Sequence, residues 1–76
     1  MPPQLPILSG REVVHVFEFL GWQVARQNGS HIIMTKKNEL ATLSVTDHRE
    51  TARGTLKSLI RSAGLTVTEF VDALHT

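Results

Sequence analysis

A short stretch near the middle of the chain, Asn28-Gly29-Ser30-His31, places a histidine directly after a predicted tight turn. Asparagine followed by glycine between two apolar runs is a strong signal for a β-hairpin with a type I′ turn, because both central residues need a positive φ. The imidazole of His31 would then stand at the first position of a β-strand. Histidine is the side chain best suited to proton transfer near neutral pH, so we interpret His31 as a candidate general acid or base.

A two-residue loop determines which residues pair across this hairpin. The predicted pairs are Gln27 with Ser30, Arg26 with His31, and Val24 with Ile33. The guanidinium of Arg26 would therefore lie beside the imidazole, at the edge of the sheet face that we expect to be buried. A purely structural role for a lone histidine at a strand end is the alternative reading, and position alone does not exclude it.

A second histidine, His48, lies in the polar connection that follows the third predicted strand. The end of that strand is expected near His31, so His48 is a candidate second proton carrier. A zinc site built on His31, Asp47 and His48 has no recognised ligand spacing. The chain contains no cysteine, which excludes a disulfide framework and a thiolate zinc site.

Three helices are predicted around these residues. Ser9 followed by Glu12 forms a capping box, and apolar residues at helical spacing extend from it, so the first helix should run from Gly10 to Leu20. A second apolar stripe predicts a helix over 53–63, in which Lys57 and Arg61 share a face that points to solvent or to phosphate. A second capping box predicts a short third helix that ends at Leu74.

The third strand is predicted over Leu40–Val45, after a three-residue loop in which Asn38 or Glu39 is left-handed. One face of the sheet would then form the core with the side chains of Trp22, Val24, Ile33, Leu43 and Val45. The other face would carry Ala25, Ile32, Met34 and Thr42. Ile32 and Met34 would leave an apolar patch that no helix covers, a candidate partner surface.

These elements predict an α+β fold of order α-β-β-β-α: a three-stranded antiparallel sheet with helices on one face, plus a short C-terminal helix. A chain of 76 residues allows a single domain. We expect a proline-rich flexible arm over 1–8 and one domain over 9–76. No export signal or membrane anchor is evident, so a cytoplasmic protein is expected.

Charge is distributed unevenly along the chain. Seven basic residues stand against three acidic ones between Arg26 and Arg61, whereas the remainder has one basic residue and four acidic ones. Such polarity fits a face that meets a polyanion, although solvated charges that merely cluster would give the same pattern.

Two motifs resemble the HicA (YcfA-like) toxins of bacterial toxin–antitoxin modules. Gly21-Trp22 followed by Arg26-Gln27-Asn28-Gly29-Ser30-His31 is similar to the family's G-W and R-Q-x-G-S-H run. The stretch from Gly54 to Leu65, GTLKSLIRSAGL, is similar to its G-T-L-[RK]-x-I-L-[RK]-x-A-G motif. Both occur in the same order, and the resemblance covers nearly all of the chain after the arm.

The resemblance implies a double-stranded-RNA-binding-domain-like fold and an mRNA interferase, an endoribonuclease that works without a metal or other cofactor. It implies that His31, the histidine of G-S-H, is catalytic and that a HicB-type antitoxin is the inhibitory partner. Attack of a ribose 2′-hydroxyl on the adjacent phosphate needs a base, an acid and cations. The hypothesised RNA-binding residues are Arg26, Gly29, Ser30, Lys57 and Arg61.

Two other functions fit the same residues. One is a non-catalytic RNA-binding module of the same fold, which would recognise A-form shape through phosphate and 2′-hydroxyl contacts. The other is a protein-interaction subunit that works through Ile32 and Met34. RNA that is retarded on a gel but left intact would indicate the first, and a complex that forms without RNA would indicate the second.

Overall fold

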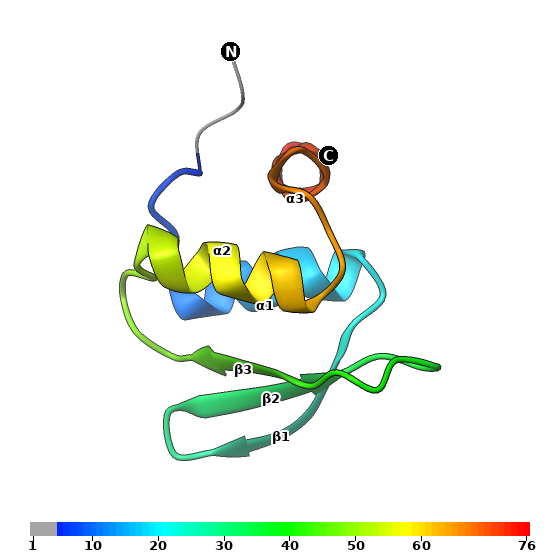
Figure 1. The fold of residues 1–76 in the computed structure, drawn as a ribbon. Helices are drawn as coiled ribbons and strands as arrows, with labels where there is room; N and C mark the ends of the chain where they lie inside the picture. The colour runs from blue at the N-terminus through cyan, green and yellow to red at the C-terminus, as the bar shows by residue number, and fades with distance from the viewer. Residues whose placement is uncertain (1–4) are drawn as a thin grey trace.

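The computed structural model describes residues 5–76. Within this range the chain forms three helices and three strands: α1 (Gly10–Phe19), β1 (Gln23–Asn28), β2 (His31–Thr35), β3 (Leu43–Thr46), α2 (Arg53–Ser62) and α3 (Val67–Leu74). The strands make one antiparallel sheet in the order β1-β2-β3. Both α1 and α2 lie over one face of this sheet, and α3 packs on the far side of them (Figure 1). The predicted α+β fold is confirmed.

Local capping contacts explain where two of the helices begin. The Ser9 hydroxyl accepts a hydrogen bond from the Glu12 backbone N–H at 3.1 Å, and the Glu12 carboxylate accepts one from the Ser9 N–H at 2.9 Å. Thr66 and Glu69 make the same pair of contacts at the start of α3. Each capping box satisfies two backbone donors that the first helical turn leaves free. Both predicted capping boxes are confirmed.

The hairpin turn lies one residue further along than predicted. Asn28 pairs with His31, so the loop consists of Gly29 and Ser30. Gly29 has a φ of +62° and Ser30 has no positive φ. Glycine with positive φ at the first central position is typical of a type II′ turn rather than type I′. The Gln27 side-chain amide donates to the Gly29 carbonyl oxygen at 3.0 Å and braces this turn.

This shift exchanges the two faces of β2. Ile32 is 2% exposed and Met34 is 0% exposed, whereas His31 is exposed and Ile33 is only partly buried. Side chains alternate along a strand, so a change of pairing by one residue moves each of them to the other face. The predicted partner surface of Ile32 and Met34 is therefore wrong, because both side chains belong to the core. Val24, predicted in the core, is 43% exposed.

The pairing with β3 gives the physical reason for this register. Ile32 lies opposite Val45 and Met34 lies opposite Leu43, so four apolar side chains meet under the helices. The predicted pairing would have placed His31 there instead, and burying an imidazole without partners is costly. Leu43 and Val45 are buried as predicted.

The connection between β2 and β3 is longer than predicted. β3 begins at Leu43 rather than Leu40, and the Leu40 side chain is fully exposed. Asn38 has a φ of 68°, which confirms a left-handed residue in this loop.

The segment before α1 also departs from the predicted arm. Leu5 and Leu8 are buried in the core. Leu8 bridges to Thr51, and the Arg53 side chain donates from Nε to the Leu5 carbonyl oxygen at 3.0 Å. These contacts attach residues 5–8 to the start of α2. The first four positions of the predicted arm lie outside the described residues.

Aromatic packing anchors α3 to the rest of the domain. The ring of Phe17 lies 5.3 Å from that of Phe70 and 6.4 Å from that of Trp22, measured between centroids. All three side chains are almost completely buried.

The longest helices within residues 5–76 have ten residues, too few to cross a membrane.

Candidate active site

His31 begins β2, the central strand of the sheet. It lies opposite Asn28 on β1 and Thr46 on β3, so its backbone is bounded on both sides. Because the neighbouring Ile32 points to the core, the imidazole projects from the opposite, open face of the sheet, and it is exposed. Strand pairing on both sides therefore fixes the backbone from which this imidazole projects.

Three segments far apart in the sequence meet beside this histidine. The Asp47 N–H donates to the Ser30 carbonyl oxygen at 2.7 Å, which attaches the exit of β3 to the hairpin turn. The Gly10 N–H donates to the His48 carbonyl oxygen at 2.9 Å, which attaches the start of α1 to the same exit. We call the segments 10–11, 30–31 and 46–48 the junction. Its backbone is held by hydrogen bonds from strand, turn and helix.

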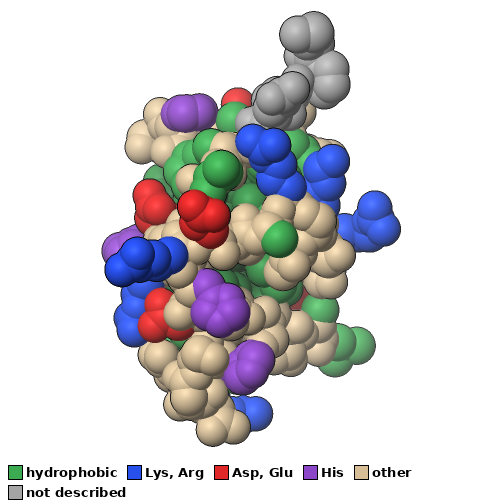
Figure 2. Space-filling view, turned by 90° about the vertical axis from the view of Figure 1, so that its left-hand side faces the viewer, with side chains coloured by type: hydrophobic (Ala, Val, Ile, Leu, Met, Phe, Trp, Pro, Cys, Tyr) green, Lys and Arg blue, Asp and Glu red, His purple; other side chains and the backbone are tan. Residues whose placement is uncertain are grey.

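The junction brings the two candidate proton carriers, His31 and His48, to the same end of the molecule. His48 follows two residues after Thr46, the residue opposite His31, and both imidazoles are exposed. Figure 2 looks onto this end, and two histidine side chains lie near the centre of the view with basic and acidic side chains to one side. The arrangement gives an accessible surface with two groups able to exchange protons.

Gly10 allows α1 to approach this closely, and sequence reasoning did not identify it. A Cβ at this position would collide with the Thr46 carbonyl oxygen and would lie 3.0 Å from the Asp47 Cα. Both obstacles are backbone atoms, which cannot move aside as a flexible side chain can. A glycine directly after the Ser9 cap was the available signal, because glycine is a poor helix former and needs a reason inside a helix.

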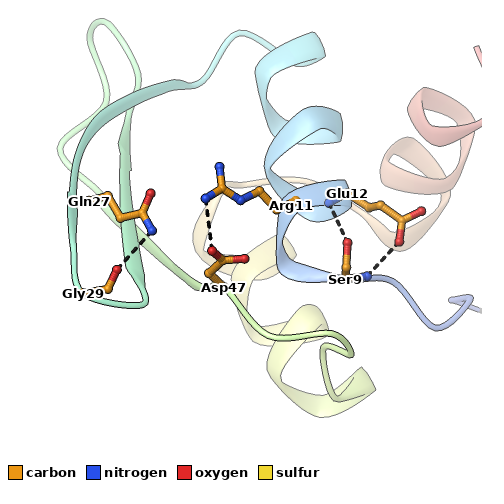
Figure 3. A network of polar contacts seen from close by, with 6 residues as sticks. All are labelled: Ser9, Arg11, Glu12, Gln27, Gly29 and Asp47. Atoms are coloured by element: carbon orange, nitrogen blue, oxygen red, sulfur yellow. Dashed lines mark hydrogen bonds and ion pairs between the residues drawn. The ribbon is translucent and has the colours of Figure 1, made fainter.

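Arg11 is a second residue that the sequence analysis missed. Its Nη2 atom lies 3.1 Å from the Asp47 Oδ2 atom, in an ion pair that joins α1 to the exit of β3. Figure 3 shows the Arg11 side chain reaching away from α1 towards this strand end. The Arg11 side chain is 65% exposed and that of Asp47 is 30% exposed. The helix thereby contributes a cation to the junction.

Arg26 does not lie directly opposite His31, as predicted. The irregularity between Val24 and Arg26 shifts the pairing, so Arg26 lies opposite Ile33. Ile33 and His31 share the open face of the sheet, which makes Arg26 a diagonal neighbour of the histidine, at a Cα separation of about 7–8 Å. Its side chain is exposed on the edge strand.

The other two predicted cations, Lys57 and Arg61, lie on the solvent side of α2. Because α2 packs over the helix-covered face of the sheet, they are separated from the open face on which His31 projects. The start of α2 lies at the junction end (Figure 1), so Lys57 is nearer to it than Arg61 by about 6 Å along the helix axis. The structure does not bring this pair to His31.

Gly29 and Ser30 form the exposed turn that presents His31. A Cβ at Gly29 would meet no atom within 4 Å, so glycine is needed there for its positive φ and not for space.

Residues 5–76 contain no group of three or more His, Cys, Asp or Glu side chains placed to hold a metal ion.

The chain was compared with models of protein families. A family model described as HicA toxin of bacterial toxin-antitoxin matches residues 10–65, from the start of α1 to the residue after Gly64. The match therefore contains the whole junction and the sheet, whereas α3 lies beyond it. No curated protein matches the chain. The chain belongs to the HicA toxin family of bacterial toxin–antitoxin modules.

Proposed function

We propose that this HicA-family toxin is a metal-independent endoribonuclease, an mRNA interferase, whose reaction depends on His31. The observation that carries the proposal is an exposed imidazole on a paired strand, with a second exposed histidine and an arginine in the same junction. Family membership supports a toxin acting with an antitoxin. RNA as the substrate, a HicB-type antitoxin and a cytoplasmic location are parts of this proposal.

The proposed reaction is an internal transfer at a phosphodiester. The ribose 2′-hydroxyl attacks the adjacent phosphorus, a 2′-oxygen–phosphorus bond forms, and the bond from phosphorus to the 5′-oxygen breaks. One histidine takes the proton of the 2′-hydroxyl, and the other gives a proton to the leaving 5′-oxygen. His31 and His48 fill these two roles, and the products are a 2′,3′-cyclic phosphate and a 5′-hydroxyl.

Phosphate binding is assigned by position. Arg26 shares the open sheet face with His31, and the Gly29-Ser30 turn flanks the imidazole, so these residues would contact RNA close to the cleaved bond. Lys57 and Arg61 would contact phosphates further along the chain, because they lie on the outer side of α2. Their contribution would be to affinity, and it should weaken with added salt.

The direct test is cleavage of mRNA by the purified protein and by the His31→Ala variant. We expect the variant to lose at least about 100-fold in rate, the usual contribution of a positioned acid or base. His15→Ala is a matched control, because His15 is an exposed histidine on α1 outside the junction. Cleavage that is equally reduced in both variants, or in neither, would contradict the assignment.

The same experiment distinguishes nuclease from binding module. Wild-type protein that retards RNA on a gel and leaves it intact would support a non-catalytic RNA-binding function. Cyclic phosphate termini identify the proposed reaction, and their formation should fall in His31→Ala as the rate does, whereas a contaminating nuclease would cleave equally in both preparations.

A further inference from the structure

The Arg11–Asp47 ion pair has a geometry that leaves most of the arginine unused. Only Nη2 contacts the carboxylate, at 3.1 Å, and no other hydrogen bond of the Arg11 side chain occurs among the described residues. A guanidinium carries several N–H donors in a planar fork that matches the oxygens of a phosphate. The remaining donors of Arg11 are therefore available at an exposed position.

Backbone hydrogen bonds from two other segments hold the chain around Asp47. Its own N–H bonds to the Ser30 carbonyl oxygen at 2.7 Å, and the next residue, His48, accepts the Gly10 N–H at 2.9 Å. The carboxylate thus projects from backbone that is tied to the hairpin turn on one side and to α1 on the other. A carboxylate fixed in this way can orient the long, flexible arginine side chain.

From this arrangement we propose that Arg11 is a phosphate-binding residue of the junction and that Asp47 is its positioning residue. The inference rests on the proposed ribonuclease function and names a source of positive charge at the edge of that site. The guanidinium would donate to a non-bridging oxygen of the RNA backbone where the strand passes between α1 and the hairpin turn, at the helix side of the sheet end. Asp47 would keep one edge of the guanidinium while the other binds the phosphate.

The pair lies at the end of the sheet that carries His31, on the side of the helices. Thr46 is paired with His31 at a Cα separation of about 5 Å, and the next residue, Asp47, projects towards α1, where Arg11 contacts it. Arg26, in contrast, stands on the edge strand and has no described ion pair to orient it. An arginine that is already oriented loses less conformational entropy on binding a phosphate than one that must be ordered on binding.

The decisive experiment compares RNA cleavage by wild type, Arg11→Gln, Arg11→Lys and Asp47→Asn. We expect Arg11→Gln to raise KM by about 10-fold, as for loss of one phosphate contact, and Arg11→Lys to recover part of this loss. Asp47→Asn should raise KM by less than Arg11→Gln, because it loosens the guanidinium but leaves its positive charge in place. Lys37→Gln is the control, because this substitution also removes one positive charge, but from the β2–β3 loop at the other end of the sheet.

Binding measured in a His31→Ala background separates this inference from the proposed function. Adding Arg11→Gln there should reduce the slope of log affinity against log salt by about one, the loss of one phosphate contact. Arg11→Gln that cleaves and binds like Lys37→Gln would overturn the inference while leaving the ribonuclease intact. Wild-type protein that cleaves no RNA would overturn the proposed function. If Arg11→Gln also left the salt slope of RNA binding unchanged, Arg11 would be excluded as a phosphate ligand as well.

Discussion

The two faces of β2 perform different tasks within five residues. Ile32 and Met34 point under the helices and are almost completely buried, whereas His31 projects from the open face. The apolar side contributes to stability by removing surface from water. The open side contributes little to stability and carries the proposed chemistry. Their alternation means that the register which builds the core also determines that the imidazole reaches solvent.

The largest expected effect is on the buried face. Met34→Ala should lower the free energy of unfolding by about 2–5 kcal/mol, because it removes a fully buried side chain and leaves a cavity. Ile33→Ala, one residue away and only partly buried, should cost clearly less. Urea denaturation of the two variants measures the difference. Equal losses would contradict the assignment of the faces.

The junction that supports the open face should be sensitive to volume at Gly10. Gly10→Ala should destabilise by about 1–3 kcal/mol, because the new methyl group meets the backbone of Thr46 and Asp47. Cleavage should fall with it, since α1 could no longer approach the exit of β3.

Gly54→Ala is the matched control for this substitution. Gly54 is also in the first turn of a helix, but its added Cβ meets nothing within 4 Å. Removing a helical glycine without a clash should stabilise by up to about 1 kcal/mol. Changes of opposite sign in the free energy of unfolding would show that the effect at Gly10 comes from the close approach of α1 to β3. Changes of the same sign would argue against this explanation.

A smaller effect is expected from the cap that begins α1. Ser9→Ala should cost about 1 kcal/mol, since the hydroxyl accepts the Glu12 N–H. The backbone N–H and then the side chain of Ser9 lower the pKa of Glu12 below its ordinary value. A lowered pKa in the folded state gives stability that is present above the ordinary glutamate pKa and is lost as the pH falls through the lowered one.

Glu12→Gln measures this pH dependence. The variant should be less stable than wild type at neutral pH, and the difference should disappear in acid once the carboxylate of the folded protein is protonated. Thermal unfolding between neutral and acidic pH follows the two curves. A difference that grows as the pH falls would have the wrong sign for a capping carboxylate.

The smallest effect on stability should come from the residue with the largest proposed role in catalysis. His31→Ala should change the free energy of unfolding by no more than about 0.5 kcal/mol, because its side chain is exposed. Denaturation beside the cleavage assay tests this separation. A substantial loss of stability would show that the His31 side chain also stabilises the fold.

Elements set by neighbouring residues were predictable. The capping boxes at Ser9 and Thr66 and the apolar stripes located all three helices to within one or two residues. A hairpin before His31 was also predictable, because a glycine turn between β-forming runs is a local signal. His31 was identified for the same reason, whereas His48 was proposed because the end of the third strand was expected beside it.

The pairing of the strands could not be read in the same way. Loops of Asn28-Gly29 and of Gly29-Ser30 both satisfy the local turn signal, yet they place opposite faces of β2 in the core. The roles of Arg11 and Gly10 were also hidden, because each depends on a strand end more than 30 residues away.

The sequence by itself determined the helices, the hairpin, the family motifs and the histidine that follows the turn, since each depends on contacts between residues close along the chain. Only the tertiary structure decided which face of β2 is buried and which cation stands at the junction. The physical reason is that burial under α1 and α2 selects among registers that are locally equivalent. Packing α1 against the end of β3 then brings Arg11 to Asp47.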